Sequence, residues 1–500
     1  MSSDPADVLV VGAGPTGLAL ALQAHDHGAR VRIVERRAEL SRPSRALIMH
    51  PRTLEVLRPH GVTDALLARG DLSPSAHLHL GTRVVPVRLA DLDLPDTEFP
   101  HLLLIRQADV ERVLWEALVA RGLEVERGVE LSDVAALGDH AVATLRRAGA
   151  ETRVPCRYVA GCDGPASIVR DRAGIGWRGR SYRQEVVLAD VELDGLTPDV
   201  AHAVPGPRGL VFVFPIGERA TWRVLATRPA GADELPFGQP GPAVPAGEVQ
   251  GLLDTAGLDA RISRVGWSAK VRLQHRLALR FRHGPLFVVG DAAHAHSPAG
   301  GQGMNLGMQD ALNLGWKLAG AARSPGTLAG PLLDSYEIER RPAARQVLAL
   351  THAVFWAEAS TDPVATAARR LVARWAAPIV PPLLRRRRLV GAGVRTLSQL
   401  RIHYRRSPLS VEGTPAGPPG PRPGERVPDA QVVTAAGRSV RLHDLIARPG
   451  IHALVQRDAP GLDLPSPGGD VHVHRIASWP GAGVVVVRPD GYVGFRSGEL

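Results

Sequence analysis

The hydrophobic positions near the N-terminus follow the alternation of an α/β unit. An apolar run at residues 8–11 predicts a short strand. A glycine-rich turn follows, and the next apolar positions recur at helical spacing to about His27. Gly28 is a typical helix stop, and residues 31–34, VRIV, predict a second strand. The pattern therefore predicts a strand, a helix and a second strand, which together make a βαβ unit.

A second strand-and-helix pattern occurs much later in the chain. The run LFVVGD at 286–291 predicts a strand, and a loop rich in glycine and proline leads from it into a helix that begins near Met304. Between the two α/β segments lie three β-rich runs, VVLADVEL at 186–193, GLVFVFPIG at 209–217 and TWRVLATR at 221–228. They predict a mainly antiparallel sheet inserted between the halves of one α/β domain.

The C-terminal part of the chain changes character again. TPAGPPGPRPG at 414–424 predicts a stiff linker, because its prolines block both helix and ladder pairing. Strand patterns return in IHALV at 451–455 and VVVV at 484–487, and Asp490-Gly491 suits a tight hairpin turn. We therefore expect a separate C-terminal domain.

Composition supports several packed units in one globular chain. The 500 residues are 44% hydrophobic and 22% charged, which suffices for large cores and argues against extended disorder. The formal charge is +10, but the arginines are scattered, with dense runs only at 385–388 and 401–406. Nucleic acid is therefore not an expected partner.

Cysteine content and the N-terminus bear on location. Cys156 and Cys162 cannot form a disulfide framework, and their spacing matches no zinc or redox pair. The N-terminus lacks a basic segment ahead of an apolar core, and no stretch approaches the ~18 uninterrupted apolar residues of a membrane span. These features predict a cytoplasmic protein that does not contact a membrane.

The turn after the first strand has the sequence GAGPTG, residues 12–17. Its glycines allow a tight turn and let a pyrophosphate approach the helix N-terminus. Glu35 follows the second strand, where an acceptor for ribose hydroxyls is needed. A glutamate repels a ribose 2′-phosphate, so the pattern favours FAD or NAD over NADP. The alternative is a tight strand-helix turn with a surface glutamate.

The second glycine-rich loop, GDAAHAHSPAGGQGMN at 290–305, points to a flavin. Asp291 offers an acceptor for sugar or ribityl hydroxyls, and the glycines let the backbone approach a flat ligand. The helix that begins near Met304 directs N–H groups and partial positive charge into the turn, which would stabilise a reduced flavin. A metal bound by Asp291, His294 and His296 is not expected, because a glycine-rich loop is a poor rigid support. Hydrogen bonding within the loop is the preferred interpretation for both histidines.

A third motif, CDGPASIVR at 162–170, follows an apolar strand. Asp163 and Gly164 end that strand, and Arg170 lies one or two helical turns later. By itself the segment fits an ordinary strand-turn-helix with an internal ion pair as well as it fits a functional turn.

Taken together and in this order, the three motifs resemble those of the FAD-dependent aromatic hydroxylases, the single-component flavoprotein monooxygenases of the p-hydroxybenzoate hydroxylase type. The resemblance extends from residue 7 to about 345. The last 75 or so residues resemble the thioredoxin-like domain of phenol and aromatic-polyketide hydroxylases, although they contain no CxxC. The implied fold is α/β, with a Rossmann-like FAD-binding domain, an inserted mainly antiparallel substrate sheet and a C-terminal thioredoxin-like α/β domain.

The resemblance also implies domain boundaries, with residues 76–100 joining the substrate region. The expected parts are a first FAD-binding part at 1–180, a substrate-binding sheet at 181–275, a second FAD-binding part with a helical segment at 276–405, a linker at 406–426 and a thioredoxin-like domain at 427–500.

Roles for individual residues follow from the same resemblance. Glu35 would take the adenosine ribose with Arg36 beside the adenine, and Asp291 would hold the ribityl or pyrophosphate region. Asp163 would touch both FAD and the nicotinamide donor. No metal ligand is implied. The residues implied to bind FAD are Gly12, Gly14, Pro15, Thr16, Gly17, Glu35, Arg36, Arg45, Gln107, Asp163, Asp291, Pro298, Gly301, Gly303, Met304 and Asn305.

In that family NADPH or NADH reduces the flavin, dioxygen forms a flavin hydroperoxide, and its distal oxygen is transferred to an electron-rich ring. The implied substrate is phenolic or an aromatic polyketide, and the enzyme would act as a monomer or homodimer. One alternative is Baeyer-Villiger oxidation or epoxidation of a polyketide on the same scaffold. A remote alternative is a non-catalytic interaction protein that keeps the nucleotide fold.

Candidates for substrate contact are few. A phenol reacts faster as phenolate, so a nearby base would help, and His50 is the one candidate; the alternative is a loop histidine exposed to solvent. Phe212 and Phe214 share one face of their strand, because alternate residues of a strand point to the same side. They and Trp222 either contact a planar substrate or belong to the sheet core, and the core is the favoured interpretation.

Overall fold

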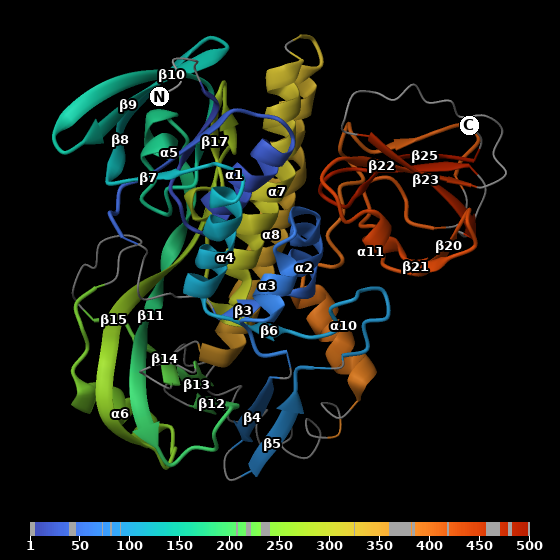
Figure 1. Cartoon of the computed structure of the whole chain (residues 1–500). Coiled ribbons are helices and arrows are strands. Elements are labelled where there is room, and N and C mark those ends of the chain that lie inside the picture. The colour runs from blue at the N-terminus through green and yellow to red at the C-terminus, as the bar shows by residue number, and fades with distance from the viewer. Residues whose placement is uncertain are drawn as a thin grey trace.

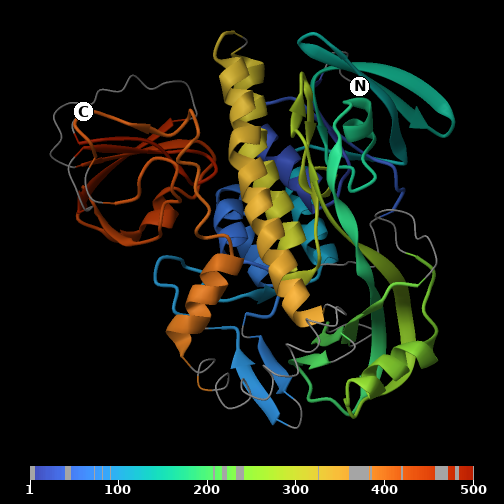
Figure 2. The ribbon, with the colours of Figure 1, turned by 180° about the vertical axis from the view of Figure 1, so that it is seen from behind.

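Three large β-sheets organise the chain. They have eight, eight and seven strands, and a two-stranded sheet joins β3 (Ile48–Met49) to β6 (Leu103–Leu104). The first sheet and the C-terminal sheet lie on opposite sides of the long helices α7 (Gln302–Arg323) and α8 (Ala329–Ala359), as Figures 1 and 2 show from front and back. The computed structural model describes residues 6–39, 47–72, 74–80, 83–90, 92–206, 209–216, 222–231, 241–324, 326–359, 382, 386–417, 420–456, 471–478 and 483–498.

The first sheet has a parallel centre, as the βαβ pattern predicts. Its order is β16-β17-β10-β1-β2-β7, with β8 and β9 attached through β9 to β10. The apolar residues of β1 are buried because helices cover the parallel strands. The strands are β1 Ala6–Val11, β2 Val31–Glu35, β7 Val125–Arg127, β8 Val129–Leu137, β9 His140–Arg147, β10 Ala150–Gly161, β16 Arg282–His283 and β17 Leu286–Val288.

Helix α1 packs closely along α7. A Cβ added at Gly307 would lie 2.5 Å from Thr16 Oγ1, and one added at Gly315 would lie 2.7 Å from Gln23 Cβ, so both positions require glycine. The contact places the start of α1 beside the start of α7. The other helices are α1 Pro15–Asp26, α2 Pro51–Leu57, α3 Thr63–Leu67, α4 Gln107–Val119, α5 Ile168–Arg172, α6 Ala246–Thr255, α10 Arg387–Leu397 and α11 Leu442–Leu445, with 3-10 turns η1 Arg58–His60, η2 Gly290–Ala292 and η3 Ala299–Gly301.

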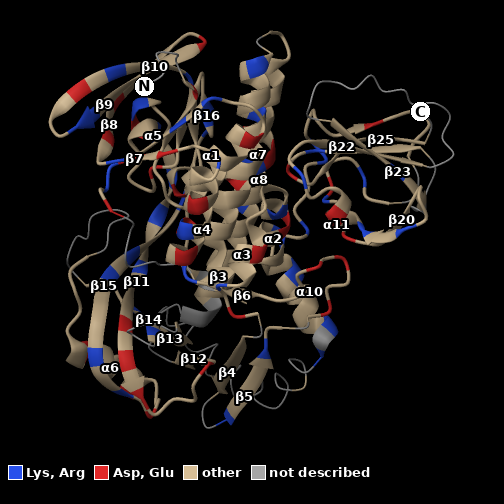
Figure 3. Ribbon diagram, in the orientation of Figure 1, with Lys and Arg blue, Asp and Glu red and all other residues tan. Residues whose placement is uncertain are grey.

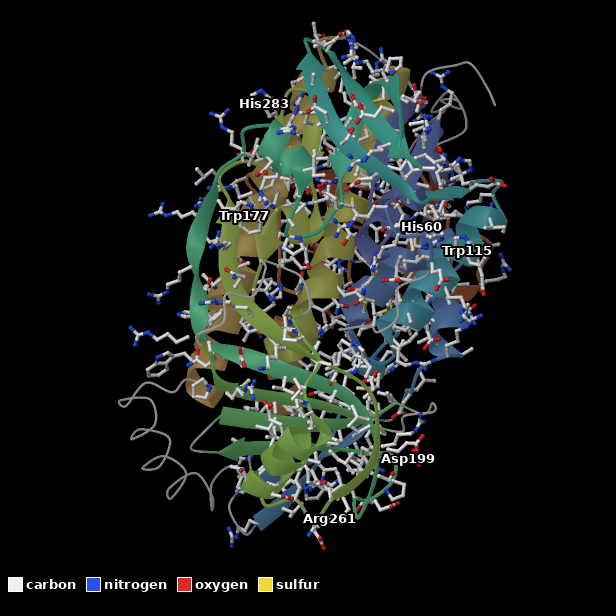
Figure 4. All side chains as sticks on the ribbon, turned by 90° about the vertical axis from the view of Figure 1, so that its left-hand side faces the viewer. His60, Trp115, Trp177, Asp199, Arg261 and His283 are labelled. Atoms are coloured by element: carbon white, nitrogen blue, oxygen red, sulfur yellow. The ribbon has the colours of Figure 1, made fainter. Side chains whose placement is uncertain are left out.

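The second sheet is mainly antiparallel and contains the three β-rich runs, although residues 217–221 lie outside the described residues. Its order is β18-β15-β11-β14-β13-β12-β4-β5. In Figure 4, Trp177 and Arg261, the first residues of β11 and β15, lie toward opposite ends of this sheet. Its strands are β4 Ser75–Leu80, β5 Arg83–Arg88, β11 Trp177–Asp194, β12 Val200–Gly206, β13 Gly209–Pro215, β14 Trp222–Pro229, β15 Arg261–Ala278 and β18 His294–Ala295.

The C-terminal sheet includes part of the segment expected to be a linker. β19 pairs with β25, and Gly424 N–H donates to the carbonyl oxygen of Val493 at 2.7 Å, so the described part of 411–424 lies along the sheet rather than spanning open space. Gly491 has φ 72° in the β24–β25 hairpin turn, as expected. The strands are β19 Val411–Glu412, β20 Gln431–Thr434, β21 Ser439–Arg441, β22 Ile451–Gln456, β23 Val471–Ser478, β24 Val484–Val487 and β25 Val493–Ser497.

The basic residues do not gather into one surface. Figure 3 shows basic and acidic positions interspersed along the ribbon. Within the arginine runs, Arg388 is almost fully exposed and Arg405 pairs with Glu425, while Arg385 lies outside the described residues. In the described part of the chain, no helix is long and apolar enough to cross a membrane.

Candidate functional site

The motifs identified in the sequence meet at one edge of the first sheet. Neighbouring strands in the order β17-β10-β1-β2 are parallel, so their carboxyl ends lie side by side. The GD turn follows β17, the DG turn follows β10, the glycine-rich turn follows β1, and Glu35 ends β2. In open α/β sheets this edge is where ligands bind.

The glycine-rich turn is closed on its protein side and open on the other. A Cβ at Gly12, where φ is 100°, would lie 2.5 Å from the carbonyl oxygen of Cys162, and one at Gly17 would lie 1.8 Å from the oxygen of Gly12. A Cβ at Gly14 would meet nothing within 4 Å. Helix α1 begins at Pro15 without a side-chain cap or an acidic residue in its first turn. Its N–H groups are therefore available to an anion.

Glu35 is buried against the glycine-rich turn. One carboxylate oxygen accepts from Ala13 N–H at 2.9 Å, and the other accepts from the backbone and the side chain of Arg37, both at 3.0 Å. Burial alone would raise the pKa of Glu35, but the hydrogen bonds from Arg37 and Ala13 lower it below its usual range. The carboxylate is thus held ionised beside the turn.

Gln107, the first residue of α4, donates to Glu111 Oε1 at 2.8 Å. Burial raises the pKa of Glu111, and the charge of nearby Glu35 raises it further. Glu111 was not among the predicted site residues. Its position four residues after Gln107 on the same predicted helix face is the signal that could have found it.

The DG turn leaves one buried acceptor without a partner. Asp163 Oδ2 accepts from the N–H groups of Ile168 and Val169 at 2.8 and 3.2 Å, while Asp163 Oδ1 is buried and has no hydrogen-bond partner. Burial raises the pKa of Asp163. Because buried polar atoms are nearly always paired, Oδ1 fits an atom that a ligand satisfies.

Arg170 connects the DG turn to the GD turn. Its guanidinium donates to the carbonyl oxygen of Ala292 at 3.1 Å and lies 4.2 Å from the ring centroid of Trp177. Burial lowers the pKa of Arg170 to about 10. Its observed contacts are thus with a backbone oxygen and an aromatic ring.

Asp291 in the GD turn and His294 just after it differ in their exposure and in their partners. The carboxylate of Asp291 is exposed and makes no hydrogen bond or ion pair with a described residue. His294 is fully buried, and its Nε2 lies 2.5 Å from Asp310 Oδ2, while Asp310 Oδ1 accepts from Arg340 at 2.6 Å. His294 therefore has a structural hydrogen bond, and among the described residues no cluster of three His, Cys, Asp or Glu side chains could hold a metal.

The loop from Pro298 to Asn305 is held by its last residue. Asn305 accepts from His50 N–H at 2.9 Å and donates to the carbonyl oxygens of Ile48 and Gly301 at 2.9 and 2.8 Å. Gly301 has φ 63° and precedes α7, which has no side-chain cap and no acidic residue in its first turn. Like α1, α7 therefore presents free N–H groups, here beside Gly303 and Met304.

His50 is neither exposed nor open to a substrate. It is 1% exposed, Nε2 lies 2.9 Å from the carbonyl oxygen of Gly300 and Nδ1 lies 3.1 Å from Ser398 Oγ. A carbonyl only accepts, so Nε2 carries the proton and Nδ1 accepts from the hydroxyl. Burial lowers the pKa of His50 to about 4. Both expectations for this residue, a catalytic base and a solvent-exposed histidine, disagree with this geometry.

The segment after α10 closes over the same loop and was missed from the sequence. Gln399 donates to Gln302 Oε1 at 2.8 Å, and Gln302 donates in turn to the carbonyl oxygen of Leu397. Gln399 has φ 62°, an uncommon conformation for a residue other than glycine. No motif in the sequence marks this contact.

The aromatic candidates on the second sheet separate by face. Phe212 and Phe214 stack at 5.5 Å and are half-buried, and Phe212 packs with Phe355 of α8 and Tyr182 of β11 in one apolar cluster. Trp222 is 6% exposed and lies in the cluster on the other face, beneath α6. Trp222 therefore packs in the core of the sheet on the face that α6 covers.

The family model described as FAD binding domain matches residues 5–351. The chain belongs to this family. It is 37% identical over 91% of its length to 6-methylpretetramide 4-monooxygenase of Streptomyces rimosus, of which it covers 78%. It is 30% identical over 98% of its length to pentachlorophenol 4-monooxygenase of Sphingobium chlorophenolicum, of which it covers 86%. The FAD-dependent monooxygenase predicted from the three motifs is confirmed.

Solved structures agree with this assignment. A ternary complex of aklavinone-11 hydroxylase with FAD and aklavinone has a TM-score of 0.78 and 27% identity, covering all of this chain and 96% of that one. An aromatic hydroxylase from angucycline biosynthesis has a TM-score of 0.77 and 29% identity, covering 99% of this chain and 96% of that one. The α/β fold with several sheets is thus that of the flavin-dependent aromatic hydroxylases.

The described residues fit FAD. The unpartnered Asp163 Oδ1, the open side of Gly14 and the two uncapped helix N-termini supply an acceptor and several donors at the edge where the motifs meet. Exposed Asp291 adds a free carboxylate, and Arg36 is exposed at the end of β2. Arg45 lies outside the described residues.

Proposed function

We propose that this FAD-dependent monooxygenase uses NADPH or NADH and dioxygen to hydroxylate a phenolic aromatic polyketide. The observation that carries the proposal is the position of the apolar face of the second sheet. Its cluster around Phe212, Leu188 and Leu210 packs against Phe355 near the end of α8. One turn earlier in α8, the carbonyl oxygen of Thr351 accepts from Ser297 Oγ in the loop that leads into α7. A flat apolar substrate fits such a face. Relatives named for polyketide and phenol substrates support the same substrate class.

In this proposal the chain's own residues bind and orient the cofactor. The N–H groups at the start of α1 bind the pyrophosphate, Glu35 accepts from the adenosine ribose, and Asp291 and Asp163 accept from the remainder of FAD. Gln107, Pro298, Gly301, Gly303, Met304 and Asn305 border the flavin. Bound FAD supplies the redox chemistry and the activation of dioxygen.

The protein around the flavin then sets the charge environment and the access of water. The N–H groups at the start of α7 stabilise negative charge on the ring system, and the apolar sheet face excludes water. The enzyme acts in the cytoplasm as a monomer or homodimer. Two unpaired cysteines, one of them with its thiol pKa raised to about 12 by burial, support a reducing compartment.

The test uses purified protein, simple phenols and polycyclic aromatic polyketides. We expect flavin absorbance, substrate-stimulated oxidation of NADPH or NADH, and a product with one oxygen from isotopically labelled dioxygen bound to a ring carbon. Absence of both stimulation and hydroxylated product across the panel would overturn the proposal. A product with oxygen inserted between two carbon atoms would replace hydroxylation with Baeyer-Villiger oxidation.

A further inference from the structure

Four polar rings lie together where the second sheet meets the loop that leads into α7. They come from Tyr182 on β11, His275 on β15, His296 after β18 and His352 on α8. We call this group of three histidines and one tyrosine the imidazole cluster. The ring centroids of His275 and His352 are 5.0 Å apart, and the Tyr182 hydroxyl lies 3.1 Å from His352 Nδ1. None of the four belongs to the FAD-binding residues named above.

Strand pairing places two of these histidines opposite each other. β15 and β18 are antiparallel, with Arg276 opposite Ala295 and Leu277 opposite His294. β18 ends at Ala295, and in the same register the next residue, His296, falls opposite His275. Residues opposite each other in antiparallel strands have Cβ atoms about 5 Å apart. On its other side His296 reaches the loop, because a Cβ at Gly303 would lie 3.8 Å from His296 Nε2. The two rings thus stand between the sheet and the flavin loop.

Each of these two rings has a nitrogen without a partner. His296 Nδ1 lies 2.7 Å from the carbonyl oxygen of Ser297, so Nδ1 carries the proton and Nε2 has the lone pair. Both His296 Nε2 and His275 Nδ1 are covered by protein and have no hydrogen-bond partner. An unsatisfied buried polar atom costs about 1–3 kcal/mol, so two in one place require an explanation. A ligand that supplies the missing partner is such an explanation.

The surroundings define what kind of ligand fits. Leu273 lies two residues before His275 on β15 and therefore shares its face, and it belongs to the apolar cluster of Phe212, Phe355 and Tyr182. A planar aromatic ring against that cluster would bring a ring hydroxyl toward the paired histidines. Burial lowers the pKa of His296 to about 4, so the ring is neutral near pH 7 and can accept a proton.

We propose that His296 Nε2 accepts the proton of the substrate's phenolic hydroxyl, while His275 Nδ1 carries a proton and donates it in a hydrogen bond to the same oxygen. The inference rests on the proposed hydroxylation. The phenol O–H bond breaks and an N–H bond forms on His296, the electron pair stays on oxygen, and the products are a phenolate and an imidazolium. In this proposal the substrate hydroxyl takes its place beside Gly303, next to which His296 Nε2 lies.

Charges around His296 act on this transfer in opposite directions. The carboxylate of Asp291 stabilises the imidazolium, and so does the carbonyl oxygen of Ser297, while His294 and His275 disfavour it if they are charged. The phenolate beside the imidazolium supplies the missing negative charge. In the free enzyme, where no phenolate is present, burial keeps the ring neutral.

The test follows a chromophoric phenol, a nitrophenol, on the FAD-loaded enzyme by absorbance across pH. In the wild type we expect the bound phenol to ionise at a lower pH than in His296→Gln, by about one unit or more. For a weakly acidic phenol kcat falls about 100-fold in His296→Gln, and it falls much less for a nitrophenol that is already ionised. His275→Gln shifts both readouts in the same direction by less.

The control is His283→Gln, because His283 is exposed on β16 and lies away from the second sheet (Figure 4). Flavin content equal to wild type shows that each variant is folded, and His275→Gln serves alone if His296→Gln fails that criterion. Unchanged ionisation of the bound phenol and a kcat within about twofold of wild type would overturn the role of the histidines while hydroxylation itself stands. If the wild type oxidises no phenol, the proposed function fails and this inference fails with it.

Discussion

Two buried polar regions flank the long helices, and they differ in how completely their groups are paired. On the sheet side the imidazole cluster leaves His275 Nδ1 and His296 Nε2 without partners. On the other side, where α7 and α8 meet the C-terminal sheet, Glu339 and Asp490 accept from every charged donor that faces them. The two unpaired nitrogens are buried, and so are both carboxylates. Only the second is complete as protein alone.

The paired region, which we call the interdomain seam, consists of Asn313, Lys317, Glu339, Arg488 and Asp490. Glu339 accepts from Lys317 at 2.6 Å and from both terminal nitrogens of Arg488 at 2.7 and 2.8 Å, and Asn313 bridges Glu339 and Asp490 at 2.7 and 2.8 Å. Burial alone would raise the pKa of Glu339, but the charges of Arg488 and Lys317 lower it well below its usual range. The seam joins the C-terminal sheet to the helix that begins at the flavin loop.

The difference lies between polar groups that the chain itself pairs and polar groups that it leaves without a partner. Desolvating a charge is costly, so a buried charge that remains in a fold has partners that offset the cost. The seam satisfies this condition from within the chain and therefore needs no ligand. The imidazole cluster and Asp163 Oδ1 do not satisfy it, and both belong to the sites that we propose for the flavin and its substrate.

The largest expected effect is at the seam. Glu339→Ala leaves Lys317 buried without its carboxylate and Arg488 with Asp490 alone, and we expect the free energy of unfolding in urea to fall by about 3–5 kcal/mol. The matched control is Glu130→Ala, which removes an exposed ion pair with Arg146 and costs about 1 kcal/mol or less. Equal losses in the two variants would contradict the view that the seam is the structural region.

A smaller effect is expected from His50, whose ring nitrogens are both paired. Its folded pKa of about 4 lies below the unfolded value of about 6.5, so the unfolded chain binds the extra proton first and stability falls as pH drops from about 6.5 to about 4. His50→Gln keeps a side chain that can hydrogen-bond but cannot titrate, and the loss of stability across this range should shrink by about 2–3 kcal/mol. Urea unfolding at several pH values measures it. His403→Gln, at an exposed position, should retain the wild-type pH dependence.

The smallest expected effect concerns Asp291, the free carboxylate at the flavin edge. Asp291→Ala removes no contact with a described residue, so the stability of the FAD-free protein should be unchanged within about 0.5 kcal/mol. FAD binding should weaken by about 1–3 kcal/mol, the value of a lost hydrogen bond to a charged group. Titration of the FAD-free protein with FAD, followed by flavin fluorescence, measures it. Unchanged affinity would remove Asp291 from the cofactor site.

Local features of the sequence were enough to predict the edge of the first sheet at which the three glycine-containing turns meet. The turn at Gly12, the DG turn and the GD loop each follow a short apolar strand, and each needs glycine for a positive φ or a close backbone approach. These requirements act over a few residues, so they are visible without the fold. Parallel pairing of β1, β10 and β17 then brings the three turns together, as the α/β pattern predicts.

The tertiary structure determined which of the predicted site residues are buried and which groups they form hydrogen bonds with. The surroundings of His50 include Ser398, from a part of the chain far away in sequence, so no local pattern could reveal that both ring nitrogens are paired. Alternation in β14 sets which residues share a face with Trp222, but the packing of α6 decides that this face is core.

The second sheet and the interdomain seam show the same division between what the local sequence determines and what tertiary packing decides. The sequence by itself determined the α/β class, the flavin motifs and their order, because strand ends, glycine turns and helix starts are set by local backbone geometry. The tertiary structure decided that His275 of β15 and His296, which follows β18, come together beside an apolar cluster, because antiparallel pairing joins strands that are separate in the chain. It also decided that the seam is fully paired, since its charges come from α7, α8 and the C-terminal hairpin and are matched only when all three are packed.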